Sequence, residues 1–565
     1  MSLFVDTLLD TARSHRGEKG ITTGEPDNPI RTTWAQVHEQ ARRMAGALVE
    51  GLSPGSAVAV LAADPTLIGP AVQAVWLAGG SVTMLHQPTP RTDLEVWAED
   101  TIRVLGMIDS KLVLLGAPFE ALAPVLDQHG IPYRRLGDLM DGQPLVCAVP
   151  VGEDEHALLQ LTSGSTADPK AVRITHGNLM SNISAMSEAA ELDERNDTMV
   201  SWLPLFHDMG MVGFLTVPMT LGIELVKVTP VEFLGSPLLW MDLISRYRAT
   251  ITAAPNFAYA LVGRRMATAA EDKHYDLSTL RLALNGAEPI DEKAVNAFTE
   301  AGARFKLRPE CVFPAYGMAE CTLAVSFVAP LSGLRLDVID AQKLEVDRKA
   351  VPIDPHRADE EDYRQHGVRT FALLGKPLPE VEVEVADEDG RRLGDREVGE
   401  FRLRGKAVTP GYLTVDGPVA TQDEEGWLST GDIGYLVDGR IVICGRRKDV
   451  IIMGGRNIYP TDIERAACTV PGVRAGNAVA VRIDAGSRRE RFAVVVESTL
   501  AGDDEAERTL RKEIGARVFE AVDMRPMAVV VLPAGTLPKT PSGKLRRAAA
   551  GQQLDEHIRA GAEAS

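Results

Sequence analysis

Short apolar runs alternate with helical patterns along the N-terminal part of this chain, and this alternation constrains the fold more than any other feature. AVAVLAA (57–63), SVTMLH (81–86) and KLVLLG (111–116) read as buried strands, with helical segments between them. The pattern returns in TITAAP, NFAYALVGRRMATAA, LRLALNGAEP, IDEKAVNAFTEAGARF and CVFPAYG. Such alternation predicts parallel sheets with helices on both faces. Two separate runs predict an α/β fold with two helix-covered sheets in one large N-terminal domain.

The C-terminal part has a different sequence pattern. GKPLPEVEVEVADEDG and the segments up to IVICGR are short alternating strands separated by Asp-Gly turns, which predict an antiparallel β subdomain. The segments from VRAGNAVAVRI to MAVVVLP predict a small α+β domain entered near GRRKDV (445–450). Between 334 and 371 the chain is polar and contains prolines, so we expect a surface insertion rather than core.

Composition excludes several classes of protein. A chain of 565 residues is too long for one core, so several domains are expected. The net charge of -19 argues against nucleic acid or an anionic membrane as a partner. Five scattered cysteines without CxxC spacing fit a reducing compartment better than disulfides or zinc. The uncharged stretch 209–223 is too short to span a bilayer, and the N-terminus lacks a signal-peptide pattern, so the sequence predicts a cytoplasmic protein without an integral membrane segment.

One segment, LTSGSTADPKAV (161–172), is rich in hydroxyl groups and ends near a single lysine. Glycine between hydroxyl residues lets backbone amides approach an anion, and Lys170 adds a positive charge. The segment lacks the Gly-Lys-Ser/Thr of a Walker A loop, because Pro169 precedes the lysine and Ala171 follows it. Taken alone, such a loop is more often a solvated turn than a phosphate site.

Seven further motifs follow in order. They are SWLPLFHDMG (201–210), TAAPNFA (252–258), LNGAEP (284–289), PAYGMAE (314–320), GWLSTGD (426–432), GRRKDVIIMGGRNIYPTDIE (445–464) and LPKTPSGKLRR (537–547). The whole set resembles the adenylate-forming superfamily of acyl-CoA synthetases, peptide-synthetase adenylation domains and luciferases. Trp202, the His207-Asp208 pair, TAAPNFAYALV and the polar insertion are typical of its fatty acyl-AMP ligase branch. Ala171 departs from the family, which usually has glycine after the lysine.

The resemblance implies that a fatty acid carboxylate attacks the α-phosphorus of ATP, giving an acyl-adenylate and pyrophosphate. No protein nucleophile is needed, so the protein must align two anions and stabilise charge on phosphoryl oxygens. ATP and Mg²⁺ are therefore the expected cofactors. A hard carboxylate ligand suits Mg²⁺, and the resemblance assigns that role to Glu320 with Thr166.

The remaining roles are carried over from the family motif by motif. Nucleotide binding is implied for Thr162, Ser163, Gly164, Ser165, Thr166, Lys170, Asn285, Gly286, Ala287, Glu288, Tyr316, Gly317, Met318, Asp432 and Arg446. Tyr316 would stack on adenine, and Asp432 would accept hydrogen bonds from both ribose hydroxyls. His207 would orient the reacting carboxylate, Lys544 would contact that carboxylate and the α-phosphate, and Lys448 would act as a hinge. Residues 1–447 would then form the N-terminal domain, with an insertion at about 340–371, and 449–565 a mobile lid.

The motifs do not identify the acceptor of the acyl group. Fatty acyl-AMP ligases pass it to the phosphopantetheine of an acyl carrier protein, and the insertion is thought to hinder the domain movement that coenzyme A transfer requires. GSRRERF (486–492) and KLRR (544–547) would offer basic docking patches to an acidic carrier, although solvated charged faces explain them equally well. A fatty acid-CoA ligase and a noncatalytic adenylate-binding scaffold are the two alternatives. Acyl chain length, pathway and oligomeric state do not follow from the sequence.

Overall fold

The computed structural model describes residues 1–88, 92–162, 168–270, 273–354, 367–453, 456–485, 490–539, 545–547, 549–552 and 554. The chain divides into two compact units. The first comprises Met1–Arg335, Leu374–Glu382 and Leu403–Leu428, and the second comprises Leu336–Leu373, Val383–Arg402 and Ser429–Ser565. Among the described residues, no helix is both long and apolar enough to cross a bilayer.

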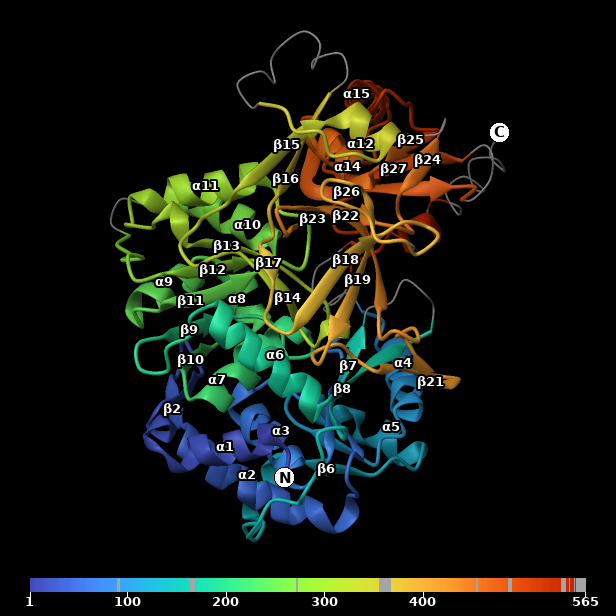
Figure 1. Ribbon diagram of the computed structural model, residues 1–565. Coiled ribbons are helices and arrows are strands. Elements are labelled where there is room, and N and C mark those ends of the chain that lie inside the picture. Colours follow the sequence, from blue (N-terminus) through green and yellow to red (C-terminus); the bar gives the residue numbers. More distant parts are fainter. Residues whose placement is uncertain are drawn as a thin grey trace. The chain divides into compact units, whose positions relative to one another are not determined.

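The first unit contains a nine-stranded sheet whose centre is parallel (Figure 1). Its order is β17 (Lys376–Pro377), β14 (Ala324–Phe327), β13 (Val312–Gly317), β12 (Leu282–Asn285), β11 (Ile251–Ala254), β9 (Thr198–Ser201), β10 (Glu224–Lys227), β1 (Gly20–Thr23) and β2 (Ile30–Thr33). The edge strands β2, β14 and β17 run antiparallel to their neighbours. The predicted parallel arrangement is thus confirmed for the centre of this sheet.

The same unit contains an eight-stranded sheet. Its order is β21 (Gly417–Ala420), β20 (Gly411–Thr414), β8 (Lys170–Thr175), β7 (His156–Thr162), β4 (Ser81–Met84), β3 (Ala57–Leu61), β5 (Leu112–Leu115) and β6 (Tyr133–Arg135). The strands from β7 to β6 are parallel, whereas β8, β20 and β21 are added antiparallel. The apolar runs predicted as strands therefore form the buried middle of this sheet.

Helices accompany both sheets in the predicted alternation. The described helices of this unit are α1 (Leu3–Arg13), α2 (Trp34–Leu48), α3 (Pro65–Leu77), α4 (Leu94–Met107), α5 (Ala123–Gln128), α6 (His176–Ala189), α7 (Val217–Leu221), α8 (Pro230–Gly235), α9 (Leu239–Arg246), α10 (Asn256–Ala267) and α11 (Glu292–Ala303), with a π-helix over Met209–Thr216. Local capping sets several of their starts. Thr33 and Gln36 form a capping box at α2, and Thr175 and Asn178 form one at α6.

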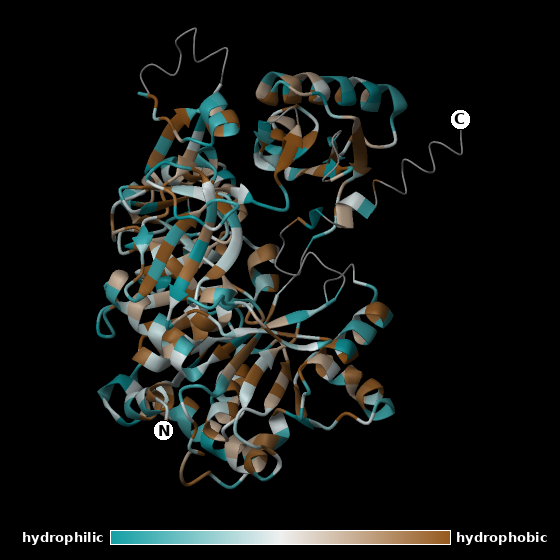
Figure 2. Cartoon of the chain, turned by 45° about the vertical axis from the view of Figure 1, so that its right-hand side comes forward, coloured by the Kyte–Doolittle hydropathy of each residue, from teal (hydrophilic) through white to brown (hydrophobic). Residues whose placement is uncertain are grey.

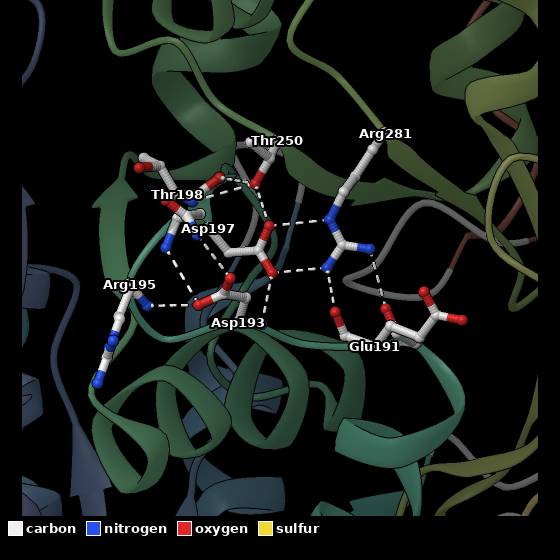
Figure 3. Close-up of polar contacts among 9 residues, drawn as sticks. Glu191, Asp193, Arg195, Asp197, Thr198, Thr250 and Arg281 are labelled. Carbon is white, nitrogen blue, oxygen red and sulfur yellow. Dashed lines mark hydrogen bonds and ion pairs between the residues drawn. The ribbon is translucent and has the colours of Figure 1, made fainter.

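A buried ion-pair network holds the amino ends of three central strands (Figure 3). Asp197 immediately precedes β9, Thr250 immediately precedes β11, and Arg281 immediately precedes β12. Arg281 Nε lies 2.9 Å from Asp197 Oδ1, and Thr250 Oγ1 donates to the same oxygen at 2.7 Å. The network therefore holds these strands together at the edge of the sheet that is opposite to their carboxyl ends.

The second unit contains the predicted antiparallel and α+β elements. A four-stranded sheet runs in the order β18 (Val381–Ala386), β19 (Gly399–Gly405), β22 (Leu428–Val437) and β23 (Arg440–Arg446), followed by the pair β24 (Ile451–Met453) and β25 (Arg456–Ile458) and by α14 (Pro460–Cys468). The strands β26 (Val473–Ile483), β27 (Arg491–Ser498) and β28 (Ala528–Pro533) form a mixed sheet. Helix α15 (Asp504–Val522) is largely hydrophilic and buries Leu510, Ile514, Val518 and Val522 (Figure 2).

The segment 334–371, which the sequence places on the surface, contributes to the core at some of its described residues, while others are exposed. Leu336–Asp340 and Val368–Ala372 pair as β15 and β16, and Ala341–Asp347 forms α12. Ile339 and Leu344 are fully buried in one apolar cluster with Tyr435 and Tyr459. This burial was not predicted because the few apolar residues of the segment pack against residues far along the chain as well as against one another. Residues 355–366 lie outside the described residues.

Candidate functional site

Most of the predicted site residues of the first unit follow the carboxyl ends of parallel strands. Trp202 follows β9, Asn285 ends β12, and Tyr316 and Gly317 end β13, while Thr162 ends β7 in the other sheet. Strand order places β9, β11, β12 and β13 side by side, so their carboxyl ends share one edge of the sheet. Ligands of open α/β sheets bind at such an edge.

Three buried polar atoms at these strand ends have no hydrogen-bond partner among the described residues. They are Thr162 Oγ1, Trp202 Nε1 and Asn285 Oδ1. Buried polar groups are normally satisfied, so an unsatisfied one indicates a missing ligand or water. The three atoms offer two kinds of group, hydroxyl or indole donors and an amide acceptor, which fit a polar ligand with several oxygen atoms.

Close backbone approach shapes the motif that ends β13. A Cβ placed on Gly317 would stand 2.2 Å from the carbonyl oxygen of Leu323, so only glycine fits there. The Tyr316 hydroxyl points to Met318 Sδ at 3.7 Å, and the tyrosine ring is largely buried. Ala287 adopts a left-handed conformation with φ 66° in the neighbouring loop. A strained non-glycine residue of this kind is typical of functional loops.

The predicted nucleotide residue Glu288 has a structural contact that its motif did not reveal. Glu288 Oε1 accepts a hydrogen bond from the backbone N–H of Phe257 at 2.6 Å, at the start of α10. Its carboxylate therefore caps a helix that begins at the candidate site. Asn285 Nδ2 donates to Asn256 Oδ1 at 3.2 Å, which links β12 to the same helix start.

Lys170 lies in a strand rather than in the loop to which the sequence assigned it. The two ends of the segment 161–172 lie in antiparallel strands, in which Leu161 pairs with Ala171 and Thr162 pairs with Lys170. Strand β8 was missed because it begins at Lys170 and its apolar residues are interrupted by Arg173. Ala171 is fully buried in strand β8, so its methyl group packs in the core. Ser163, Gly164, Ser165 and Thr166 lie outside the described residues.

Glu320, the predicted metal ligand, is partly exposed and follows the β13 motif. Its Oε1 accepts a hydrogen bond from the Tyr412 hydroxyl at 2.5 Å, and the Tyr412 ring lies under Lys170 with Nζ 3.8 Å from the ring centroid. Mg²⁺ in nucleotide sites takes one or two carboxylates and completes its shell with phosphates and water. A single accessible carboxylate beside a lysine therefore fits the implied metal. Sequence reasoning missed Tyr412, and its GYLT motif carries no distinctive signal.

His207 lies on the segment that follows β9. Its Nδ1 is 2.6 Å from Asp208 Oδ1, which orients the imidazole, and Gln160 of β7 donates to the neighbouring carbonyl of Phe206 at 3.0 Å. His86 packs edge-on against Phe206, and burial together with the nearby His207 lowers the pKa of His86 to about 4. These contacts bring the ends of β4, β7 and β9 together.

A buried lysine also contacts the segment that follows β9. Lys227 ends β10 and donates through Nζ to the carbonyl oxygens of Leu203 and, at 3.3 Å, Val228. Burial lowers the pKa of Lys227 to about 7. The sequence offered no signal for this role, because the lysine lies within an apolar run and its acceptors are backbone carbonyls.

The second unit holds the predicted ribose and hinge residues. Asp432 is buried, and Arg446 is half-exposed with Nε 2.9 Å from Asp432 Oδ1. The carbonyl oxygen of Lys448 accepts a hydrogen bond from Arg482 at 2.5 Å. Lys544 lies outside the described residues, as do residues 486–489 of the first proposed docking patch.

This chain is similar to known proteins along most of its length. A family model described as AMP-binding enzyme matches residues 10–413. A protein of Mycobacterium tuberculosis named as a candidate ligase, Rv1013, is 52% identical over 97% of this chain and 99% of its own. The long-chain-fatty-acid–AMP ligase FadD26 of Mycobacterium marinum is 31% identical over 92% of this chain and 90% of its own.

Two further similarities concern the acceptor and the fold. The medium-chain-fatty-acid–[acyl-carrier-protein] ligase JamA of Moorena producens is 35% identical over 71% of this chain and 68% of its own. A structure from a study of fatty acyl-adenylate ligases from E. coli and L. pneumophila superposes with a TM-score of 0.88 at 30% identity, covering 99% of both chains.

Proposed function

Because this chain belongs to the AMP-binding enzymes, and among them to the fatty acyl-AMP ligases, we propose that it activates a medium- or long-chain fatty acid as its acyl-adenylate and passes the acyl group to the phosphopantetheine of an acyl carrier protein. ATP is the nucleotide that this family uses. The observation that carries the proposal is the set of unsatisfied buried polar atoms at the carboxyl ends of β7, β9 and β12.

In this proposal the residues of the first unit hold the reactants. Thr162 and Lys170 bind the terminal phosphates with residues 163–166, Tyr316 supports the adenine, and Asn285 to Glu288 lie along the nucleotide and the acyl group. Glu320 would hold Mg²⁺, which when bound would supply positive charge to offset that of the phosphates. His207 orients the fatty acid carboxylate, since its own orientation is set by Asp208.

Adenylation itself needs alignment more than protein chemistry. The carboxylate oxygen attacks the α-phosphorus, the P–O bond to the leaving pyrophosphate breaks, and negative charge develops on the phosphoryl oxygens. Lys544, in the proposed lid, contacts the oxygens on which this charge develops. Asp432 and Arg446 bind the ribose. Groups that act where charge develops affect the rate more than ground-state binding. Lys448 is the hinge in this scheme.

Contacts inside the second unit support carrier protein over coenzyme A as the acceptor. Glu345 of α12 is buried, with Oε1 paired to Arg369 and Oε2 2.6 Å from the Arg456 guanidinium. Arg369 also pairs with Asp462 at the start of α14. These ion pairs join the insertion to residues beyond Lys448. A lid tied in this way would resist the rotation that coenzyme A transfer requires.

One assay set tests the proposal. The protein receives ATP, Mg²⁺ and radiolabelled dodecanoate, and acyl-AMP is followed alone, with coenzyme A, or with a phosphopantetheinylated carrier protein. We expect acyl-AMP in every case and acylated carrier protein in the third. Acyl-CoA made as readily as acyl-AMP would favour the fatty acid-CoA ligase. An absence of acyl-AMP with every acid tested would favour the noncatalytic scaffold.

A further inference from the structure

We propose that Tyr412 is a positioning residue of the nucleotide site, whose hydroxyl orients the Glu320 carboxylate and whose ring supports the Lys170 ammonium group. The inference rests on the proposed function, because it assumes that Lys170 and Glu320 serve one nucleotide. Tyr412 itself contacts neither reactant in this scheme. It acts through the two charged residues that do.

Strand pairing places the Tyr412 ring beneath Lys170. In the ladder between β20 and β8, Tyr412 pairs with Val172 and Thr414 pairs with Lys170. Tyr412 and Lys170 are therefore diagonal neighbours on one face of the sheet, a spacing that long and aromatic side chains can bridge. The distance of 3.8 Å from Lys170 Nζ to the ring centroid is that of a cation–π contact.

The other end of Tyr412 holds Glu320. Its hydroxyl donates to Glu320 Oε1 at 2.5 Å, the short length of a charge-assisted hydrogen bond. Backbone contacts fix the two segments against each other. Thr409 N donates to the carbonyl oxygen of Glu320 at 2.8 Å, and Thr322 Oγ1 donates to that of Ala407 at 2.9 Å. The tyrosine is thus held on a strand that is tied to the Glu320 turn.

The segment that leads into the strand of Tyr412 is anchored to helix α6 and to strand β8. Asn178 Nδ2 donates to the carbonyl oxygens of Lys406 and Val408 at 2.6 and 3.2 Å, just before β20. Thr409 Oγ1 donates to the carbonyl oxygen of Arg173 in β8. Both anchors are backbone acceptors, so a change in the Tyr412 side chain leaves them in place.

A neutral tyrosine suits this position because the two groups it contacts carry opposite charges. Its ring attracts the cation and its hydroxyl binds the anion, yet it neutralises neither. Because tyrosine is neutral, the positive charge of Lys170 stays available to a phosphate and the negative charge of Glu320 stays available to Mg²⁺. A phenylalanine would keep the ring and lose the hydroxyl, so the two contacts can be separated by mutation.

Calorimetric titration with ATP in the absence of fatty acid tests the inference without turnover. Wild type, Tyr412→Phe and Tyr412→Leu are each titrated in EDTA and in Mg²⁺. We expect Tyr412→Phe to bind ATP as wild type does in EDTA but to lose about tenfold of the tightening that Mg²⁺ brings, the size expected for a hydrogen bond to a charged group. Tyr412→Leu should also weaken binding in EDTA by about threefold, through loss of the cation–π contact.

Tyr247→Phe is the matched control. The Tyr247 hydroxyl donates to the buried Glu25 at 2.5 Å, the same kind of bond outside the site, so this variant should keep both dissociation constants. An unchanged Mg²⁺ effect in Tyr412→Phe would overturn the inference while leaving the proposed function intact. Equal losses in EDTA and Mg²⁺ for both Tyr412 variants would reduce Tyr412 to a packing role and overturn it too. A wild type that binds no ATP would overturn both proposals.

Discussion

Arg446 Nε lies 2.9 Å from Asp432 Oδ1, and the two residues are direct partners across β22 and β23. The sequence assigned both to one ribose from separate motifs, and the antiparallel ladder places them face to face. Asp432 is buried and Arg446 is half-exposed, so the arginine both supports the carboxylate and reaches outward. One hairpin therefore presents the pair as a unit.

Asp432→Asn should raise the KM for ATP about tenfold in acyl-AMP formation and change kcat less. The amide keeps the shape of the side chain but loses the charge that strengthens its hydrogen bonds to ribose and to Arg446. Asp438→Asn is the control, since Asp438 lies in the turn of the same hairpin, 3.4 Å from Arg440, and both side chains are exposed. An equal rise in both variants would contradict the ribose assignment.

Lys544→Ala should lower the rate of adenylation by at least about a hundredfold, because the lysine would meet charge that develops in the transition state. ATP binding, measured by calorimetry, should change little. Lys512→Ala removes an exposed lysine from α15 and should leave both quantities unchanged. Wild-type turnover in Lys544→Ala would refute the role of this residue.

Glu345→Ala should destabilise the second unit by about 3–5 kcal/mol, since it leaves two arginines without their buried carboxylate. Amide hydrogen exchange should quicken in α12, β25 and α14, and acyl-CoA formation should rise relative to acyl-AMP. Glu388→Ala breaks an exposed pair with Arg348 in the same unit and should cost less than about 1 kcal/mol. Faster exchange without any gain in acyl-CoA would separate the ion pairs from acceptor choice.

Asp197→Ala should lower the stability of the first unit by about 3–5 kcal/mol in urea unfolding and leave the KM for ATP within about twofold of wild type. The network of Asp197 and Arg281 holds the amino ends of the strands, whereas the candidate site lies at their carboxyl ends. Lys306→Ala, which breaks an exposed pair with Asp276, should have little effect on either. A large rise in KM for Asp197→Ala alone would show that the two edges are coupled.

Mild acid should destabilise the first unit through His176. Burial lowers the pKa of His176 to about 4, below the value of about 6.5 expected in the unfolded chain. Between these values the unfolded chain binds a proton that the native state does not, so stability is fully present above pH 6.5 and is lost as pH falls toward 4. The loss approaches about 1.4 kcal/mol per pH unit within that window.

Melting temperatures between pH 7.5 and 5 measure this effect. The decline should be shallower in His176→Asn, although that variant will start from a lower melting temperature because it loses the ring packed against Phe4. His129→Asn replaces an exposed histidine and should keep the wild-type slope. An unchanged slope in His176→Asn would exclude His176 as the source.

Much of the first unit could be predicted from periodicity. The apolar runs at 57–61, 81–84 and 112–115 became β3, β4 and β5 because a strand buried on both faces needs a continuous apolar stretch. Strand β8 escaped prediction because it begins at Lys170 and Arg173 interrupts its apolar residues. The burial of the described insertion escaped for a related reason, since Leu344 packs in a cluster that includes Tyr435 and Tyr459, which lie far along the chain.

By itself the sequence determined the alternation of strands and helices in the centre of the first unit, the family, and the residue types available for binding phosphate, metal and ribose. Those properties follow from local periodicity and from motifs that act over a few neighbouring positions. Only the tertiary structure decided that Tyr412 lies between Lys170 and Glu320, and that Glu345 meets Arg369 and Arg456. These contacts join residues far apart in the chain, and the distance between such residues is set by sheet register and packing rather than by any pattern along the chain.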